Sequence, residues 1–168
     1  MKQRMIWVAM LGLALASTSA AQTKISGMLS CADANAKPDP AYSIDVGDSA
    51  GHSLGLLKVA CTYTNPMQIE GVAMKDSYEV DTTDIRGTRM RVNGYEMVNM
   101  ANGDKVFART SGTSTLTKDG IPNTGAGSWS FTGGTGKYKG ITGKGTYRWA
   151  GGNAPMEIEG EYTLPAKK

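Results

Sequence analysis

The chain has 168 residues, with 18 Lys and Arg against 15 Asp and Glu, which gives a net charge of +3. Two of the basic residues, Lys2 and Arg4, lie in a segment that we expect to be removed, which leaves +1. A charge so close to zero argues against a nucleic-acid-binding protein, which needs a concentrated basic face. The length suits one domain with a sizeable core.

Residues 1–21 have the three parts of a secretory signal peptide. Two positive charges precede an uncharged apolar run from Met5 to Ala16, and small residues follow up to Ala21. Because crossing a bilayer takes about 20 apolar residues, the run is too short for a membrane anchor. We expect cleavage after Ala21, or one residue earlier. The sequence therefore predicts a signal peptide over 1–21 and a single periplasmic or secreted domain over 22–168, with no membrane span.

The next feature along the chain is the pair Cys31 and Cys61, the only two cysteines. In the oxidising compartment that export implies, such a pair usually forms a disulfide. The bridge closes a loop of about 30 residues and stabilises the fold by about 3–4 kcal/mol on the chain-entropy model. A redox pair would need a Cys-x-x-Cys spacing. Since His52 is the only histidine, we expect no metal site, and we expect no cofactor.

After residue 21 the chain alternates apolar and polar residues, with Gly, Asn, Asp and Pro at short intervals, which is typical of short β-strands. Asn102-Gly103 is a strong hairpin signal. Residues 32–52 are expected to form a long loop that contains at most one short strand. The expected strands cover 24–29, 54–63, 67–74, 87–100, 103–118, 127–132, 140–149 and 156–164.

The last two expected strands show the alternation most clearly, and they contain glycines at Gly140, Gly143 and Gly145. Glycine inside a strand is costly unless the sheet must bend or another backbone must approach closely. Barrels bend their sheets, and closure removes sheet edges that would otherwise aggregate. The sequence therefore predicts an all-β fold, an antiparallel barrel of about eight strands.

The glycine-rich segment 129–140 is not a phosphate-binding loop. A P-loop has glycine five places before its Gly-Lys pair, and Phe131 occupies that place here. A dinucleotide fingerprint starting at Gly134 would need glycine where Lys139 stands. Neither stretch is expected to open a helix, so no helix N-terminus is available for a phosphate. We interpret the segment as a tight turn between barrel strands.

The block Gly-Gly-Thr-Gly-Lys-Tyr-Lys-Gly at 133–140, followed by Gly-Lys-Gly-Thr-Tyr at 143–147, resembles the signature of the allene oxide cyclase and dirigent barrels. It is most similar to small secreted bacterial proteins related to them in fold. The resemblance implies an eight-stranded antiparallel barrel whose lumen admits a small apolar molecule. Plant members cyclise an epoxide or steer phenoxy-radical coupling. Their catalytic side chains have no assigned counterparts in this chain, so the resemblance implies a fold and not an activity.

Glu96 is the first candidate catalytic residue. It shares the even positions of its expected strand with apolar residues such as Val92 and Val98. On a dry face its carboxyl group would have a raised pKa, a condition found at functional sites. A β-bulge at Gly94 would instead return Glu96 to water, and this is the interpretation that we favour.

His52 is the second candidate, since a histidine at a barrel mouth could act as a general acid or base. The simpler interpretation is a local hydrogen-bonding residue. Glu70 and Arg109 lie on expected strands and could meet as a buried pair in the lumen. The remaining candidate lumen residues are aromatic, and they would serve both as core and as ligand site in a hollow barrel: Trp129, Tyr147 and Trp149.

Three functions are compatible with these features. The leading hypothesis is a barrel that binds a small, mainly apolar ligand. The alternatives are an enzyme of cyclase or dirigent type and a structural, envelope-associated protein with a solid barrel. We expect no nucleic-acid partner, and self-association into a homo-oligomer is left open.

Overall fold

The computed structural model of the protein describes residues 22–31 and 41–166. The expected signal peptide at 1–21 lies outside the described residues, as does part of the expected loop, 32–40. The described residues form ten strands and one short 3-10 helix, η1. The strands are β1 (Thr23–Cys31), β2 (Ala41–Asp45), β3 (His52–Asn65), β4 (Gln68–Ile69), β5 (Val72–Arg86), β6 (Arg89–Met100), β7 (Lys105–Leu116), β8 (Pro122–Gly134), β9 (Thr142–Trp149) and β10 (Met156–Thr163), and η1 covers Gly136–Tyr138.

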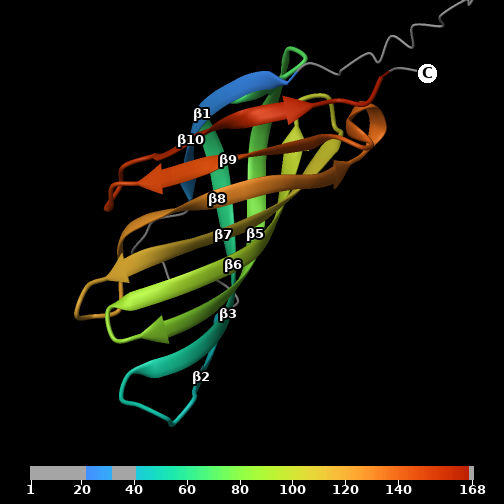
Figure 1. Ribbon diagram of the computed structural model, residues 1–168. Helices are drawn as coiled ribbons and strands as arrows, with labels where there is room; N and C mark the ends of the chain where they lie inside the picture. Colours follow the sequence, from blue (N-terminus) through green and yellow to red (C-terminus); the bar gives the residue numbers. More distant parts are fainter. Residues whose placement is uncertain (1–21, 32–40, 167–168) are drawn as a thin grey trace, which may run out of the picture.

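Eight of the strands close into an antiparallel barrel, as the sequence predicts. The order around the barrel is β3-β1-β10-β9-β8-β7-β6-β5, and β5 pairs back with β3 to complete the circle. Figure 1 shows β10, β9, β8, β7 and β6 side by side as one curved layer, with β5 and β3 crossing behind it. β2 extends the sheet along one end of β3, and β4 forms a short hairpin with β5.

The expected strand pattern is wrong between residues 67 and 86. The expected strand 67–74 is divided into β4 and the start of β5 by a turn, in which Glu70 and Gly71 have positive φ angles of 48° and 74°. β5 then continues for 15 residues. Most of β5 escapes sequence analysis because its inward-facing residues are polar, so the apolar residues that usually mark the inner face of a strand are missing.

The predicted disulfide between Cys31 and Cys61 is present, and it joins β1 to β3 where these residues lie directly opposite each other. The bridge fits an oxidising compartment. Among the described residues, no helix is long and apolar enough to cross a membrane.

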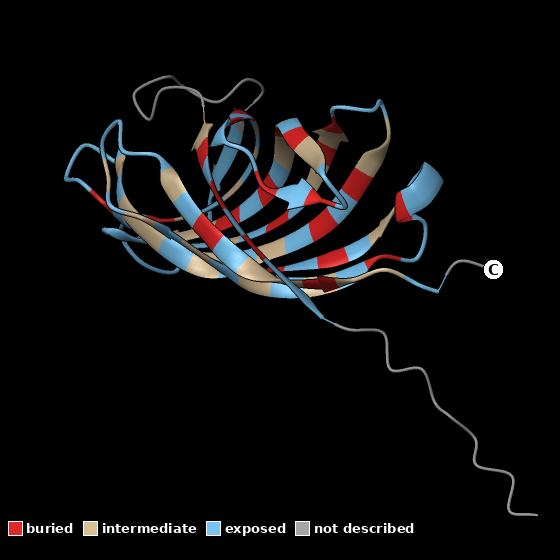
Figure 2. Ribbon diagram, turned by 90° about the horizontal axis from the view of Figure 1, so that it is seen from above, coloured by how far each residue is buried: buried red, intermediate tan, exposed pale blue. Residues whose placement is uncertain are grey.

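Side chains alternate between the inside and the outside of the barrel, so buried and half-buried positions alternate with exposed ones along the strands (Figure 2). One end of the lumen is filled by a dense core that includes Met74, Val98, Val106 and Tyr138. Towards the other end several inward residues, such as Met90 and Ser114, are only half-buried. The lumen is therefore closed at one end by packed side chains.

Glycines inside the strands make room for large inward side chains. Gly145 and Gly160 lie under the indole ring of Trp129, and a Cβ atom at Gly145 would come within 2.5 Å of its Cζ2 atom. Gly112 and Gly127 similarly lie under the hydroxyl group of Tyr147. These glycines are therefore explained by the close approach of other groups and not by bending of the sheet.

The glycine-rich segment joins β8 to β9, in agreement with its interpretation as a turn. Gly136 and Gly140 adopt positive φ angles of 51° and 79°, which glycine tolerates without strain. The Asp104 carboxylate packs against Gly136, and the Tyr138 side chain is fully buried beneath the turn. A carboxylate at this position would repel a phosphate, which agrees with the sequence argument.

Candidate functional site

The lumen contains a cavity of about 200 Å³, and residues of all eight barrel strands line it. Most of the wall is apolar or aromatic. Three carboxylic acids also face it, namely Glu79 and Asp81 of β5 and Glu96 of β6. Among the described residues that line the cavity, none is Lys, Arg or His. The cavity is therefore an apolar chamber with one acidic side.

The strand register brings the three acids together. Glu79 lies directly opposite Glu96 in the β5–β6 pairing, and Asp81 lies opposite Gly94. A Cβ atom at position 94 would overlap the Asp81 Oδ1 atom. Because Gly94 has no side chain, the Asp81 carboxylate can occupy the space above its backbone. The acidic side of the cavity thus depends on one strand glycine.

This arrangement overturns the interpretation that we favoured for Glu96. The β5–β6 ladder runs without a register shift from the pair Asp76–Asn99 to the pair Arg86–Arg89, so there is no bulge at Gly94. Glu96 therefore keeps the inward direction of its even-numbered neighbours. The glycine that suggested a bulge serves instead to leave room for a neighbouring carboxylate.

Burial without a compensating cation makes these carboxyl groups hard to ionise. Burial, together with the nearby charge of Glu79, raises the pKa of Glu96 to about 7. The same two causes raise the pKa of Asp81 to about 7. Burial also raises the pKa of Glu79. Because the three groups interact, they titrate as one coupled set and not as three independent residues.

Two tyrosines face the acids. The Tyr63 hydroxyl donates a hydrogen bond of 3.5 Å to Glu96 Oε1, and burial raises the pKa of Tyr63 well above its ordinary value. Burial and the charges of Glu79 and Asp81 raise the pKa of Tyr147 to about 12. Both phenols therefore keep their protons at neutral pH and can act as hydrogen-bond donors.

Three buried polar atoms beside the cavity have no hydrogen-bond partner among the described residues: Asp81 Oδ1, Thr110 Oγ1 and Trp129 Nε1. Asp81 and Trp129 are only 5% and 6% exposed. Cross-strand pairing places Asp81, Gly94, Thr110 and Trp129 next to one another at one level of the barrel. This level offers a carboxylate acceptor and an indole donor that the protein itself does not satisfy, which is unusual for buried polar groups.

The three aromatic residues that we predicted as lumen residues do line the cavity: Trp129, Tyr147 and Trp149. The Trp149 indole nitrogen donates to the Ala154 carbonyl oxygen at 3.0 Å, which fixes that ring near the less buried end. A role of these residues in binding a ligand stays a prediction.

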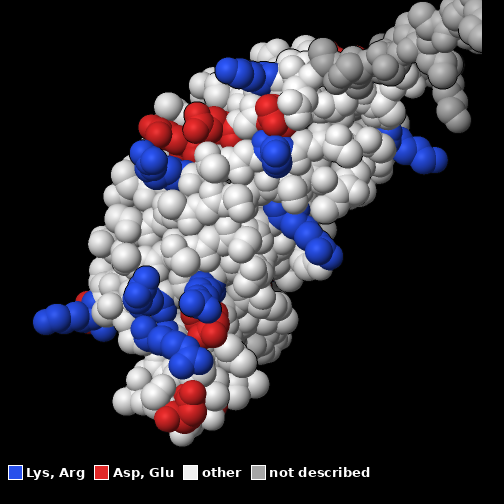
Figure 3. Space-filling model, in the orientation of Figure 1, with Lys and Arg blue, Asp and Glu red and all other residues white. Residues whose placement is uncertain are grey.

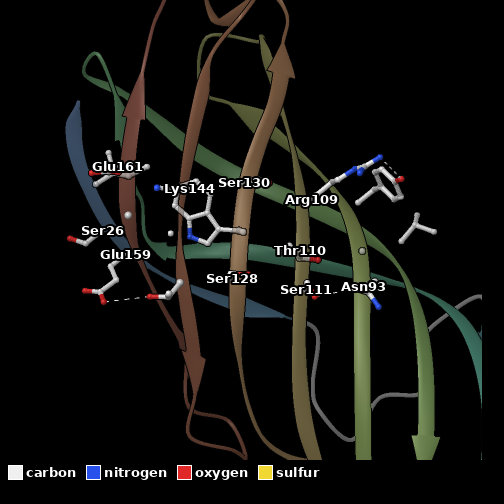
Figure 4. Close-up of a pocket in the computed structure, with 18 of the residues that line it drawn as sticks. Ser26, Asn93, Arg109, Thr110, Ser111, Ser128, Ser130, Lys144, Glu159 and Glu161 are labelled. Atoms are coloured by element: carbon white, nitrogen blue, oxygen red, sulfur yellow. Dashed lines mark hydrogen bonds between the residues drawn. The ribbon is translucent and has the colours of Figure 1, made fainter. Parts of the chain in front are cut away.

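The expected buried pair of Glu70 and Arg109 does not form. Glu70 lies in the β4–β5 turn, and its carboxylate is 3.9 Å from Lys137 Nζ. β7 directs its even-numbered residues inwards, so Arg109 points outwards. There its Nη2 atom donates to the Tyr95 hydroxyl at 2.9 Å, and Figure 4 shows this side chain directed towards the tyrosine.

His52 is buried, at 5% exposure, but on the outer side of the sheet. Its Nδ1 atom contacts the Asp48 carboxylate, and its Nε2 atom lies 3.3 Å from Asp84 Oδ1. Arg86 Nε lies 3.4 Å from the same Asp84 oxygen. The imidazole therefore ties the β2–β3 turn to β5. It lies on the opposite face of the sheet from Glu96, so the two candidate catalytic residues are not brought together.

A larger hollow of about 1360 Å³ lies on the outer face of the barrel (Figure 4). Short polar residues such as Ser111, Ser128 and Ser130 line its floor, and Glu159 and Lys144 stand at one side. Basic and acidic side chains are interspersed on the surface in Figure 3. We take the lumen and not this hollow as the candidate site, because the lumen is the more enclosed of the two and is lined by three acids with raised pKa values.

Sequence reasoning missed Glu79, Asp81 and Tyr63. Polar residues at every second position from Ser77 to Thr83 were an available signal for a strand with a polar inner face. No group of described residues has an arrangement that could hold a metal ion. No protein-family model matches the sequence, and the search of curated proteins finds no match either.

Proposed function

We propose that the lumen of the barrel binds a small, mainly apolar molecule. The observation that supports this function is the lumen cavity of about 200 Å³, with apolar and aromatic walls and a few polar groups on one side. Small-molecule sites in proteins commonly combine these features, and the mouths of β-barrels are one of their preferred places.

The proposed setting is the periplasm or the outside of the cell, after removal of residues 1–21. The Cys31–Cys61 disulfide supports an oxidising compartment. A barrel that binds an apolar molecule there would keep it out of water. The resemblance to the allene oxide cyclase and dirigent barrels is part of the same proposal, since it implies a lumen of this kind.

An enzyme of cyclase type is the second candidate. The observation in its favour is the Glu96 carboxyl group, whose pKa of about 7 suits proton transfer at neutral pH, beside the Tyr63 hydroxyl. This candidate requires turnover of a bound substrate. A binding protein would return its ligand unchanged.

Mass spectrometry of the protein purified from its native host tests the proposed function. We expect a small organic molecule to be released on denaturation. Ser114→Trp narrows the half-buried end of the lumen and should remove this molecule, whereas the outward-facing neighbour Thr113→Trp should retain it. Absence of any bound molecule, together with no binding of small aromatic probes, would favour the structural alternative.

A further inference from the structure

We propose that the lumen recognises a positively charged nitrogen, and that its ligand is an amine with an apolar body. This proposal rests on the proposed function and names the ligand class for the same site. It follows from the charge of the cavity, from polar atoms without partners, and from the aromatic surfaces around them.

The charge of the cavity is the first observation. Glu79, Asp81 and Glu96 face it, and no basic residue is among the described residues that line it. Buried acids in proteins are normally paired with a cation, because an unpaired buried charge is costly. On the face of the molecule in Figure 3, in contrast, side chains of both signs of charge are present. A cationic ligand would supply the partner that the chain does not.

The second observation concerns hydrogen bonding. Asp81 Oδ1, Thr110 Oγ1 and Trp129 Nε1 are buried, lie at the same level of the barrel and have no partner among the described residues. An ammonium group is a pure donor and can satisfy the Asp81 oxygen. The indole N–H group can in turn donate to a second polar atom of the ligand or to a water molecule.

The aromatic wall is the third observation. The rings of Trp129 and Phe131 lie with their centroids 4.7 Å apart, and Tyr147 lines the same cavity. Cations are attracted to the faces of aromatic rings, most strongly when water is excluded. The combination of carboxylates and aromatic faces suits an organic ammonium ion. The same acids would repel a carboxylate or a phosphate. A neutral ligand would not explain why three acids face the cavity.

Three probes with the same ring and different charge test the proposal: phenethylamine, phenethyl alcohol and phenylacetate. Their affinities for residues 22–168 are measured at pH 7 by NMR titration, and lumen amide resonances identify the site. We expect the amine to bind about tenfold more tightly than the alcohol, or more, and phenylacetate to bind most weakly.

Two results would overturn the proposal in different ways. Equal affinities for the amine and the alcohol would refute charge recognition and leave the proposed lumen function intact. If neither shifts the lumen resonances, the proposed function fails as well.

Two lumen variants test which residues recognise the amine. Asp81→Asn and Glu96→Gln each remove one charge with little change of shape, and each should lose most of the preference for the amine. The matched control is Glu159→Gln, on the outer face, which should keep it. Circular dichroism checks that each variant folds. If one lumen variant fails to fold, the other is enough to test the proposal. A loss of preference in Glu159→Gln alone would place amine binding in the outer hollow and refute the proposal.

Discussion

The Asp81 carboxylate lies over the backbone of Gly94 on the neighbouring strand, in space that a side chain at position 94 would occupy. We therefore expect Gly94→Ala to displace this carboxylate and to destabilise the protein by about 1–3 kcal/mol, as overpacking of a core does. In a protein that already carries Asp81→Ala, Gly94→Ala should lower the free energy of unfolding by clearly less. Urea unfolding of the four proteins in this double-mutant cycle measures the difference. Equal costs in both backgrounds would contradict the contact.

The raised pKa of Glu96 makes the stability of the fold depend on pH. Since its pKa is about 7 in the folded protein and 4.5 ordinarily, the folded state binds more protons between these values. Stability from this group is therefore fully present below about pH 4.5 and is lost as the pH rises through 7.

Glu96→Gln should remove the share of this dependence that Glu96 contributes, while Glu79 and Asp81 keep theirs. At pH 8 we expect the variant to be more stable than the parent by up to about 3 kcal/mol, and at pH 4 the difference should vanish. The exposed Glu157→Gln serves as the control and should change stability by less than about 0.5 kcal/mol at either pH. Chemical unfolding at both pH values gives these numbers. An unchanged pH profile in Glu96→Gln would mean that the carboxylate is solvated.

The disulfide should contribute a large share of the stability. Replacing Cys31 and Cys61 together by Ser is expected to lower the free energy of unfolding by about 3–4 kcal/mol. Urea unfolding with and without reductant measures it in the parent protein. Thiol titration of unreduced, denatured protein should find no free thiol, and two reactive thiols would show that the bridge does not form.

We expect His52 to stabilise the fold and to take no part in ligand binding. His52→Ala removes one of the two residues that contact both Asp48 and Asp84, the other being Arg86. We therefore expect faster hydrogen exchange in the β2–β3 turn and a loss of about 1–3 kcal/mol. Affinity for phenethylamine should change less than about threefold, because the ring lies outside the lumen. A large loss of affinity at unchanged stability would assign His52 to the site.

The barrel could be predicted from sequence because its outer and inner faces differ in polarity along most strands, as in β10, where Glu157 and Glu159 alternate with Ile158. The disulfide followed from export and from a single cysteine pair. β5 could not be found in this way, since Glu79 and Asp81 replace apolar residues on its inner face. The strand that carries two of the three acids of the candidate site was therefore the one that the pattern concealed.

Glu96 shows a second limit of sequence reasoning. Its alternation with apolar neighbours was visible, but the cost of burying a carboxylate favoured a bulge at the nearby glycine. The structure accommodates the carboxylate through a hydrogen bond from Tyr63 and a raised pKa. Neither Tyr63 nor Asp81 can be assigned to the neighbourhood of Glu96 without the strand register.

Carbon-detected NMR titration of the Glu96 carboxyl group tests the central claim most directly, that the lumen is a site whose acids are shielded from water. In the free protein we expect a pKa of about 7 for Glu96. Saturation with phenethylamine should lower this pKa, because a nearby cation favours the ionised form, while phenethyl alcohol should not lower it. A pKa near 4.5 in the free protein, unchanged by the amine, would contradict the account.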